Sequence, residues 1–167
     1  MPLEKNFWQK KNLTDMNNEE WEALCDGCGQ CCLHKLDDGG EMVFTNIACH
    51  LLDNKTGGCR HYAKRATLVH DCVQLTAKKV PTIDWLPTTC AYRLVHEKKD
   101  LYPWHHLISG NRDTVHQAGM SVRGKIVSEK KINEPLLMAM ERPEHQLRRE
   151  LRKQVPTIQK IFGRLAG

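Results

Sequence analysis

The sequence predicts a small, irregular α+β domain that leans toward helix, with short β-hairpins organised around a group of cysteines and a basic helical tail. Three observations indicate this fold class. Glycine-rich turn signals separate short segments of β-favouring residues, helical patterns lie on either side of them, and eight cysteines fall between residues 25 and 90. With 40% hydrophobic and 27% charged residues the chain is globular, and we expect a cysteine-rich domain over residues 1–145 followed by a tail over 146–167.

The first predicted element is a short acidic helix over residues 15–24. Asn17 or Asn18 can cap it, and glutamates follow in its first turn, where the helix dipole favours negative charge. The helix leads into the segment 25–32, where Gly27 and Gly29 indicate a tight loop rather than more helix.

Two hairpins are expected next. Residues 33–36 and 41–49 read as strands joined by the turn Asp37-Asp38-Gly39-Gly40, because Val, Phe, Thr and Ile favour the extended state in the second segment. Residues 51–53 and 59–62 form a second hairpin around the turn 54–58, which would bring Cys49 and Cys59 near each other.

The remaining elements are weaker predictions. Helices are expected over residues 63–69, 88–98 and 111–118, with Pro87 near the start of the second and Gly119 ending the third. Residues 101–110 read as irregular and 121–127 as an exposed strand. In the tail, helical patterns cover residues 134–141 and 144–154 on either side of Pro143, and an apolar stripe follows at Ile158, Ile161, Phe162 and Leu165.

The N-terminus carries no basic segment followed by an apolar stretch, and no run approaches the roughly 18 to 20 apolar residues that span a membrane. We therefore expect a cytoplasmic protein without a membrane partner, in a compartment where thiols stay reduced. Eight cysteines then indicate metal ligands, whereas in a secreted chain they would indicate four disulfides. The net charge of +5, from 25 basic and 20 acidic residues, permits an acidic partner without indicating one.

The cysteine spacing is the most specific feature of the chain. The Cys-x2-Cys spacing lets two thiolates converge on one metal, and here it extends to Cys25-x2-Cys28-x2-Cys31-Cys32, which suits zinc and iron–sulfur clusters alike. Adjacent side chains in extended backbone point to opposite sides, so Cys31 and Cys32 can serve two sites, bridge two metals, or leave one of them simply packed. We predict as metal ligands Cys25, Cys28, Cys31, Cys32, Cys49, Cys59, Cys72 and Cys90, with a packed core cysteine as the alternative for the last.

The histidines are weaker candidates. His34, His50, His61 and His70 each lie within two residues of a cysteine, although packing or solvation is the expected state of any one of them. The pair His105-His106 follows Trp104 and can form a further site, but packing under a loop is the expectation.

Several spaced motifs together resemble the YkgJ-type family of zinc- or iron-chelating domains. The motifs are the cysteine array, Cys49-x-Leu51-Leu52-Asp53, Cys59-x2-Tyr62-x2-Arg65 and Cys72. Longer signatures resemble its YcgN-like bacterial branch, namely 84–94 around Trp85-Leu86-Pro87 and Cys90, 104–110, and Val115-His116-x-Ala118-Gly119. The resemblance covers about residues 5–145, leaves the basic tail outside, and implies a metal-chelating domain without supplying a reaction or substrate.

Three functions follow, and whether the protein is an enzyme stays open. The first is a metal-binding protein that holds zinc or iron, with an iron–sulfur cluster included. The second is a redox enzyme using an iron–sulfur cluster or non-haem iron. The third is a metal-stabilised adaptor whose C-terminal helix binds protein or, with weaker support, nucleic acid, through six basic residues against one acidic residue over 145–167.

Overall fold

A computed structural model describes residues 3–132, which form short helices around a three-stranded sheet. The α-helices are α1 (Phe7–Lys10), α2 (Asn18–Ala23), α3 (Arg65–Leu68), α4 (Ala91–His96), α5 (His106–Ser109) and α6 (Thr114–Gln117). The strands are β1 (Leu33–Asp38), β2 (Glu41–Ala48) and β3 (Val127–Ser128). Single 3-10 turns cover Leu13–Asp15, Gln30–Cys32, Tyr62–Lys64, Val80–Thr82 and Glu129–Lys131. The predicted tail helices, the apolar stripe and the boundary at 145 lie outside the described residues.

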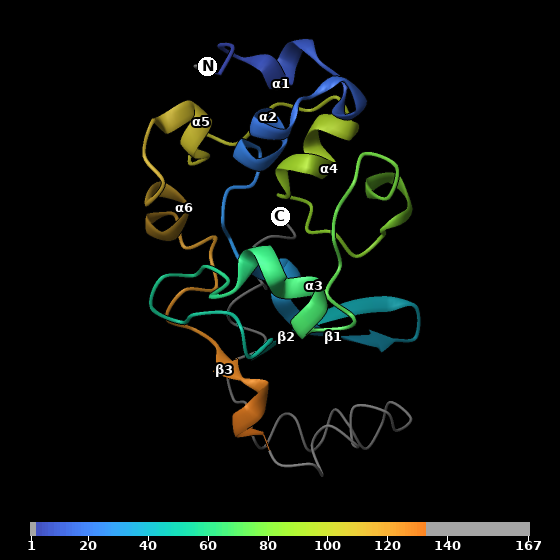
Figure 1. Ribbon diagram of the computed structural model, residues 1–167, viewed down its shortest axis with the longest axis vertical. Coiled ribbons are helices and arrows are strands. Elements are labelled where there is room, and N and C mark those ends of the chain that lie inside the picture. Colours follow the sequence, from blue (N-terminus) through green and yellow to red (C-terminus); the bar gives the residue numbers. More distant parts are fainter. Residues whose placement is uncertain (1–2, 133–167) are drawn as a thin grey trace.

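Within residues 3–132, a helical core and a sheet core are distinct from each other. The helical core unites α1, α2 and α4 with the segments between them, and Figure 1 shows these helices gathered at one end of the molecule. The sheet core is smaller and consists of Leu33, Ala48, Leu52, Val122 and Ile126. The cysteine loop 25–32 connects the two, because it leaves α2 at the helical core and enters β1 at the sheet core.

The predicted acidic helix is confirmed as α2, with the expected cap. The Asn17 side chain accepts a hydrogen bond from Glu20 N at 2.9 Å, and the Glu20 carboxylate accepts from Asn17 N at 3.0 Å. This reciprocal pair satisfies backbone donors that the first turn leaves free. Lys11 lies 2.6 Å from the same carboxylate and joins the helix start to the N-terminal segment.

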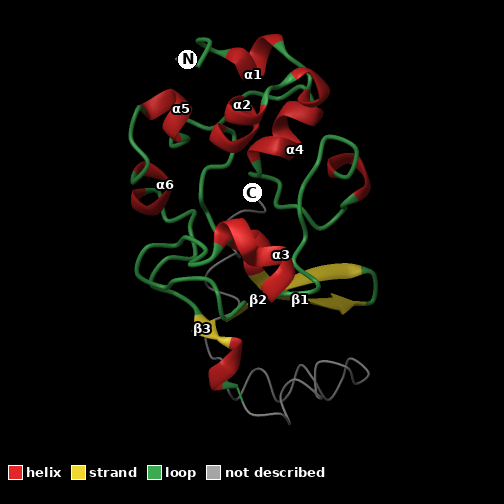
Figure 2. Ribbon diagram, in the orientation of Figure 1, coloured by secondary structure: helices red, strands yellow, loops and turns green. Residues whose placement is uncertain are grey.

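The first predicted hairpin is also confirmed. β1 and β2 pair antiparallel from Leu33↔Ala48 to Asp38↔Glu41, and Gly39 and Gly40 take the positive φ angles that a two-residue hairpin turn needs. Figure 2 shows this ribbon at the end of the molecule away from α1. The second predicted hairpin is reduced to a single bridge, Leu52↔Cys59.

β3 adds to the sheet in parallel with β2, pairing Ile47↔Val127 and Ala48↔Ser128. The prediction of an exposed strand over residues 121–127 is therefore wrong, both in the length of the strand and in its exposure. Only Val127 of that range lies in a strand, while Val122 and Ile126 are buried in the sheet core. The backbone of this segment turns instead of extending, because Lys125 N donates to Val122 O. Val122 N donates to Cys28 O and so ties the segment to the cysteine loop.

The helical predictions need three further corrections. α4 begins at Ala91 rather than 88, because Cys90 N donates to Pro87 O in a turn and Cys90 itself is extended. The segment 101–110, expected to be irregular, contains α5, whose start is capped by the His105 ring. α1 was not predicted, because four residues are too few to show a helical period. It nevertheless buries the aromatic rings of Phe7 and Trp8. The predicted helices 63–69 and 111–118 are present as the shorter α3 and α6. No helix among residues 3–132 has the length and apolar character needed to cross a membrane.

Candidate metal centre

The cysteine loop is shaped by two glycines and one aspartate. Gly27 and Gly29 have φ angles of +77° and +75°, a region that favours glycine. The buried Asp26 carboxylate accepts a hydrogen bond from Cys28 N at 2.9 Å and so closes a turn inside the loop. Cys32 N then donates to Gly29 O at 3.1 Å, which starts the 3-10 turn that carries the adjacent cysteines.

A first thiol set, Cys25, Cys28, Cys31 and Cys90, lies around Asp26. Burial, together with the negative charges of Cys31 and Asp26, raises the pKa of Cys25 to about 12. Burial also raises the pKa of Cys28 well above its ordinary value, again with help from Asp26 and Cys31. The pKa of Cys90 rises to about 11 through burial and the same two neighbours. These mutual effects show that the four thiols are electrostatic neighbours.

A second thiol set, Cys32, Cys49, Cys59 and Cys72, lies on the sheet side of the loop. Cys49 N donates to Cys32 O at 3.0 Å, so the end of β2 is tied to the end of the cysteine loop. Burial raises the pKa of Cys49, and the negative charges of Glu129, Cys59 and Cys72 add to the effect. The predicted approach of Cys49 and Cys59 is therefore confirmed.

The adjacent cysteines join the two sets. They sit in a 3-10 turn, not in the extended backbone that would separate their side chains, and the Cys32 thiol donates a hydrogen bond to Cys31. This bond lowers the pKa of Cys31 and raises that of Cys32, and the Lys35 ammonium group also favours the Cys31 thiolate. Lys35 is held beside the loop because it donates to Cys31 O at 3.0 Å and lies 4.1 Å from the centroid of the Trp85 ring.

All eight cysteines are free, and none is fully buried: Cys31 is exposed and the other seven are half-buried. Cys25 and Cys90 pack against the helical core, whereas Cys32 packs against the sheet core. Cys90 is not a residue of α4, as predicted, but the residue that precedes the helix. The array lies where the two cores meet, with its thiols near the surface.

The histidine pair His105-His106 belongs to the packing, as expected. The ring of His105 is 2% exposed, accepts a hydrogen bond from Leu107 N at its Nδ1 atom, and lies 3.0 Å from Leu24 O through its Nε2 atom. Both ring nitrogens are therefore engaged with the backbone. His106 stacks on His105 with ring centroids 4.6 Å apart, and its ring nitrogens form no hydrogen bond.

His34 and His50, each close to a cysteine in the sequence, contact the carboxylate of Glu129, which was not predicted as a site residue. His34 Nε2 lies 2.6 Å from Glu129 Oε2, and His50 Nδ1 lies 2.5 Å from Glu129 Oε1. Burial opposes ionisation of Glu129, but hydrogen bonds from the His50 backbone, the His50 ring and the His34 ring lower its pKa overall. His61 and His70, by contrast, are exposed.

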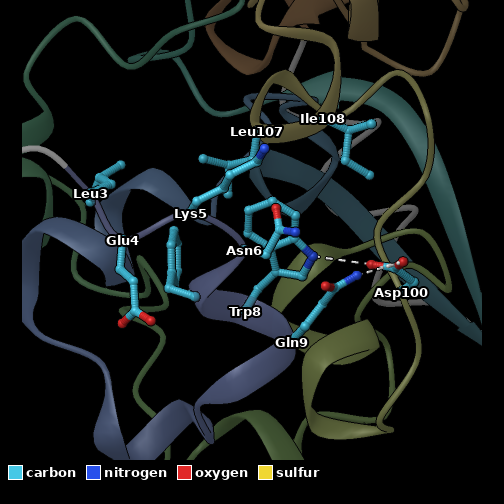
Figure 3. Close-up of a pocket in the computed structure, with 10 residues that line it drawn as sticks. Leu3, Glu4, Lys5, Asn6, Trp8, Gln9, Asp100, Leu107 and Ile108 are labelled. Atoms are coloured by element: carbon cyan, nitrogen blue, oxygen red, sulfur yellow. Dashed lines mark hydrogen bonds between the residues drawn. The ribbon is translucent and has the colours of Figure 1, made fainter.

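A pocket of about 520 Å³ lies away from the thiols, between the N-terminal segment and α5. Figure 3 shows Trp8 and Gln9 pointing toward Asp100 at one side of it, with Leu107 and Ile108 at another. None of its lining residues is a cysteine or a histidine. The pocket therefore does not belong to the candidate metal centre.

The comparisons with known proteins agree with the cysteine geometry. Residues 24–91, which contain all eight cysteines, match the CxxCxxCC family model, described as a "putative zinc- or iron-chelating domain". A UPF0260 protein of Allorhizobium ampelinum is 56% identical over 129 residues, which cover 76% of this chain and 81% of the relative. UPF0260 proteins of Agrobacterium fabrum and Brucella canis are 58% and 57% identical, over 74% and 75% of this chain and 77% and 84% of the relatives.

No solved structure matches the chain. The family resemblance predicted from the cysteine spacing is confirmed by the match to the family model and by the relatives. The chain belongs to the UPF0260 protein family and carries the CxxCxxCC domain.

Proposed function

We propose that this protein is a metal-binding protein that chelates zinc or iron through its cysteine array, and that it does so in the cytoplasm. The observation that carries the proposal is the arrangement of the thiols. Eight free cysteines form two adjoining sets, and none of them is fully buried. A purely structural role for these cysteines in packing would place them in the two cores, whereas no cysteine is among the buried core residues.

The donor set determines the class of metal. Thiolates are soft ligands that favour zinc and iron–sulfur clusters over magnesium or calcium. Burial and mutual repulsion raise the pKa of Cys25 and Cys28, so these thiols are protonated in the metal-free protein and release protons when a metal binds. Lys35, next to Cys31, offsets part of the negative charge of the resulting thiolate complex.

The spacing of the thiols favours an iron–sulfur cluster as a second candidate, with a redox role. A zinc–sulfur bond of about 2.3 Å places the sulfurs of a tetrahedral site about 3.8 Å apart. Among residues 3–132, the one group of three metal-ligating side chains with atoms within 4.8 Å of one another is Cys49, His50 and Glu129. The thiols of the first set are therefore farther apart than the sulfurs of a tetrahedral zinc site. A cluster of several irons would fill such a space better than one zinc ion.

Elemental analysis and the visible absorption spectrum of protein purified without air test the proposal and separate its two forms. Colourless protein with one or two zinc ions per chain supports a chelating module, whereas brown protein with iron and acid-labile sulfide supports the cluster. The variant Cys28→Ser should lose metal from the array in either case. Wild-type protein that binds neither metal, or a variant with unchanged metal content, would contradict the proposal.

A further inference from the structure

The parallel pairing of β2 with β3 brings together metal-ligating residues that are far apart in the sequence. Ala48 pairs with Ser128 at the last position of both strands. Because parallel strands end at the same edge of a sheet, the residues that follow, Cys49 and Glu129, leave the sheet side by side. His50 comes next along the chain from Cys49 and lies at the same edge.

Glu129 is held at this edge by three hydrogen-bonding contacts. Its Oε1 atom accepts from His50 N at 2.8 Å and lies 2.5 Å from His50 Nδ1. Its Oε2 atom lies 2.6 Å from Nε2 of His34, which belongs to β1. The carboxylate is therefore fixed between two imidazoles, one from β1 and one from the turn that follows β2.

The arrangement also includes a thiol. One ligand atom each from Cys49, His50 and Glu129 lies within 4.8 Å of the other two, and all three residues are half-buried. Sulfur, nitrogen and oxygen donors thus converge at a place that a solvated ion can reach. The side chains of His34, His50 and Glu129 are 28%, 25% and 23% exposed.

We propose that Cys49, His50 and Glu129 form a metal site of their own, for a divalent transition ion such as Zn²⁺ or Fe²⁺, with His34 orienting the carboxylate. Imidazole and thiolate exclude magnesium and calcium as preferred ions, and zinc accepts all three donor types at about 2.0–2.3 Å. A ligating carboxylate normally takes a further hydrogen bond that fixes its orientation, and the contact from His34 fills this role.

Three protein ligands leave a coordination position for water or another small ligand, as in catalytic rather than structural zinc sites. The site goes beyond the proposed function, since it uses nitrogen and oxygen ligands outside the cysteine array. It also assigns Cys49 a different role from the first thiol set, because Cys49 groups with a histidine and a carboxylate whose ligand atoms all lie within 4.8 Å of one another. Metal at this site and metal at the first thiol set are therefore separable.

Titration of the full-length, metal-free protein with Co²⁺ under anaerobic conditions tests the site, since visible absorption reports both the stoichiometry and thiolate coordination. Glu129→Gln keeps the size of the side chain and an oxygen that can accept from His50 N, and His50→Ala is the second variant. His96→Ala, which removes an exposed histidine at the end of α4, is the matched control. Circular dichroism and the unfolding midpoint establish that each variant is folded.

We expect Glu129→Gln and His50→Ala each to lose one equivalent of Co²⁺ relative to wild type and His96→Ala. Folded Cys28→Ser should retain that equivalent, and Cys49→Ser should remove its thiolate absorption. Unchanged stoichiometry in folded Glu129→Gln and His50→Ala would overturn the site while leaving the cysteine array untouched. Loss of all Co²⁺ from folded Cys28→Ser would also overturn it, because the site would not be independent. A single wild-type equivalent that Cys28→Ser retains and Glu129→Gln loses would support this site and refute the proposed function of the array.

Discussion

Gly29 is the position where the shape of the cysteine loop is most sensitive to one added methyl group. A Cβ atom at Gly29 would lie 2.6 Å from Cγ2 of Val122, a distance that real Cβ atoms do not adopt, and 3.6 Å from Leu52. Val122 is 3% exposed and belongs to the sheet core, so it has little room to move away. The φ angle of +75° adds strain for any residue with a Cβ atom.

The cost of Gly29→Ala has two parts. The left-handed backbone conformation costs about 1–2 kcal/mol for a residue other than glycine. Overpacking against Val122 costs about 1–3 kcal/mol more. Gly27 is a matched control, because its φ is +77° and nothing lies within 4 Å of its Cβ position. Gly27→Ala should therefore show only the first part, and the effect of alanine on the unfolded chain is common to both variants.

The assay is equilibrium unfolding in urea at a fixed, saturating concentration of free metal, since bound metal itself stabilises the folded state. We expect Gly29→Ala to be less stable than Gly27→Ala by about 1–3 kcal/mol. Adding Val122→Ala to Gly29→Ala should recover that difference, so the two substitutions are not additive. Equal losses for the two glycine variants, or strict additivity with Val122→Ala, would refute the close packing of this loop on the sheet core.

Three further predictions concern the residues around the centre. His105→Ala leaves Leu24 O and Leu107 N without their hydrogen-bond partner, so it should lower the free energy of unfolding in urea by about 2–5 kcal/mol. The metal content per folded chain should stay the same. A drop in metal content would contradict the packing role of His105. Burial and the positive charges of His105 and Arg112 lower the pKa of His106 from 6.5 to about 4. As the pH falls, His106 is therefore protonated in the unfolded chain before it is protonated in the folded one. The stability of the fold should fall as the pH drops from about 6.5 toward 4. His106→Phe should keep the stacking and reduce the loss of melting temperature between pH 7 and pH 5, and an equal loss in both proteins would count against this assignment. Lys35→Met removes the cation beside Cys31 and should weaken metal binding roughly tenfold, as measured by competition with a chelator. Unchanged affinity would show that Lys35 only packs against Trp85.

Local signals in the sequence predicted the elements that depend on neighbouring residues. Asn17 and Glu20 stand three apart and form the cap of α2, and Gly39 and Gly40 form the hairpin turn. α1 is different. Trp8 packs into the helical core there, and its indole N–H donates to Asp100 at 3.0 Å, ninety-two positions later in the chain. No local pattern reports such contacts.

The candidate site shows the same division. The spacing of Cys25, Cys28 and Cys31 indicates metal ligands directly, because the residues converge within one loop. Glu129 lies 79 residues beyond His50 and has no cysteine beside it. Only the parallel pairing of β3 with β2 brings it to the others, and a two-residue strand leaves no period in the sequence by which that pairing could be recognised.

The measurement that tests the central claim most directly is the metal content of the full-length protein purified without air, compared with that of Cys28→Ser. The account predicts zinc or iron bound to the wild-type chain, a lower metal content in the variant because the array no longer binds its share, and a fall in melting temperature when a chelator removes the metal from the wild type. Wild-type protein that is folded, free of both metals and unable to bind either one on addition would contradict the account.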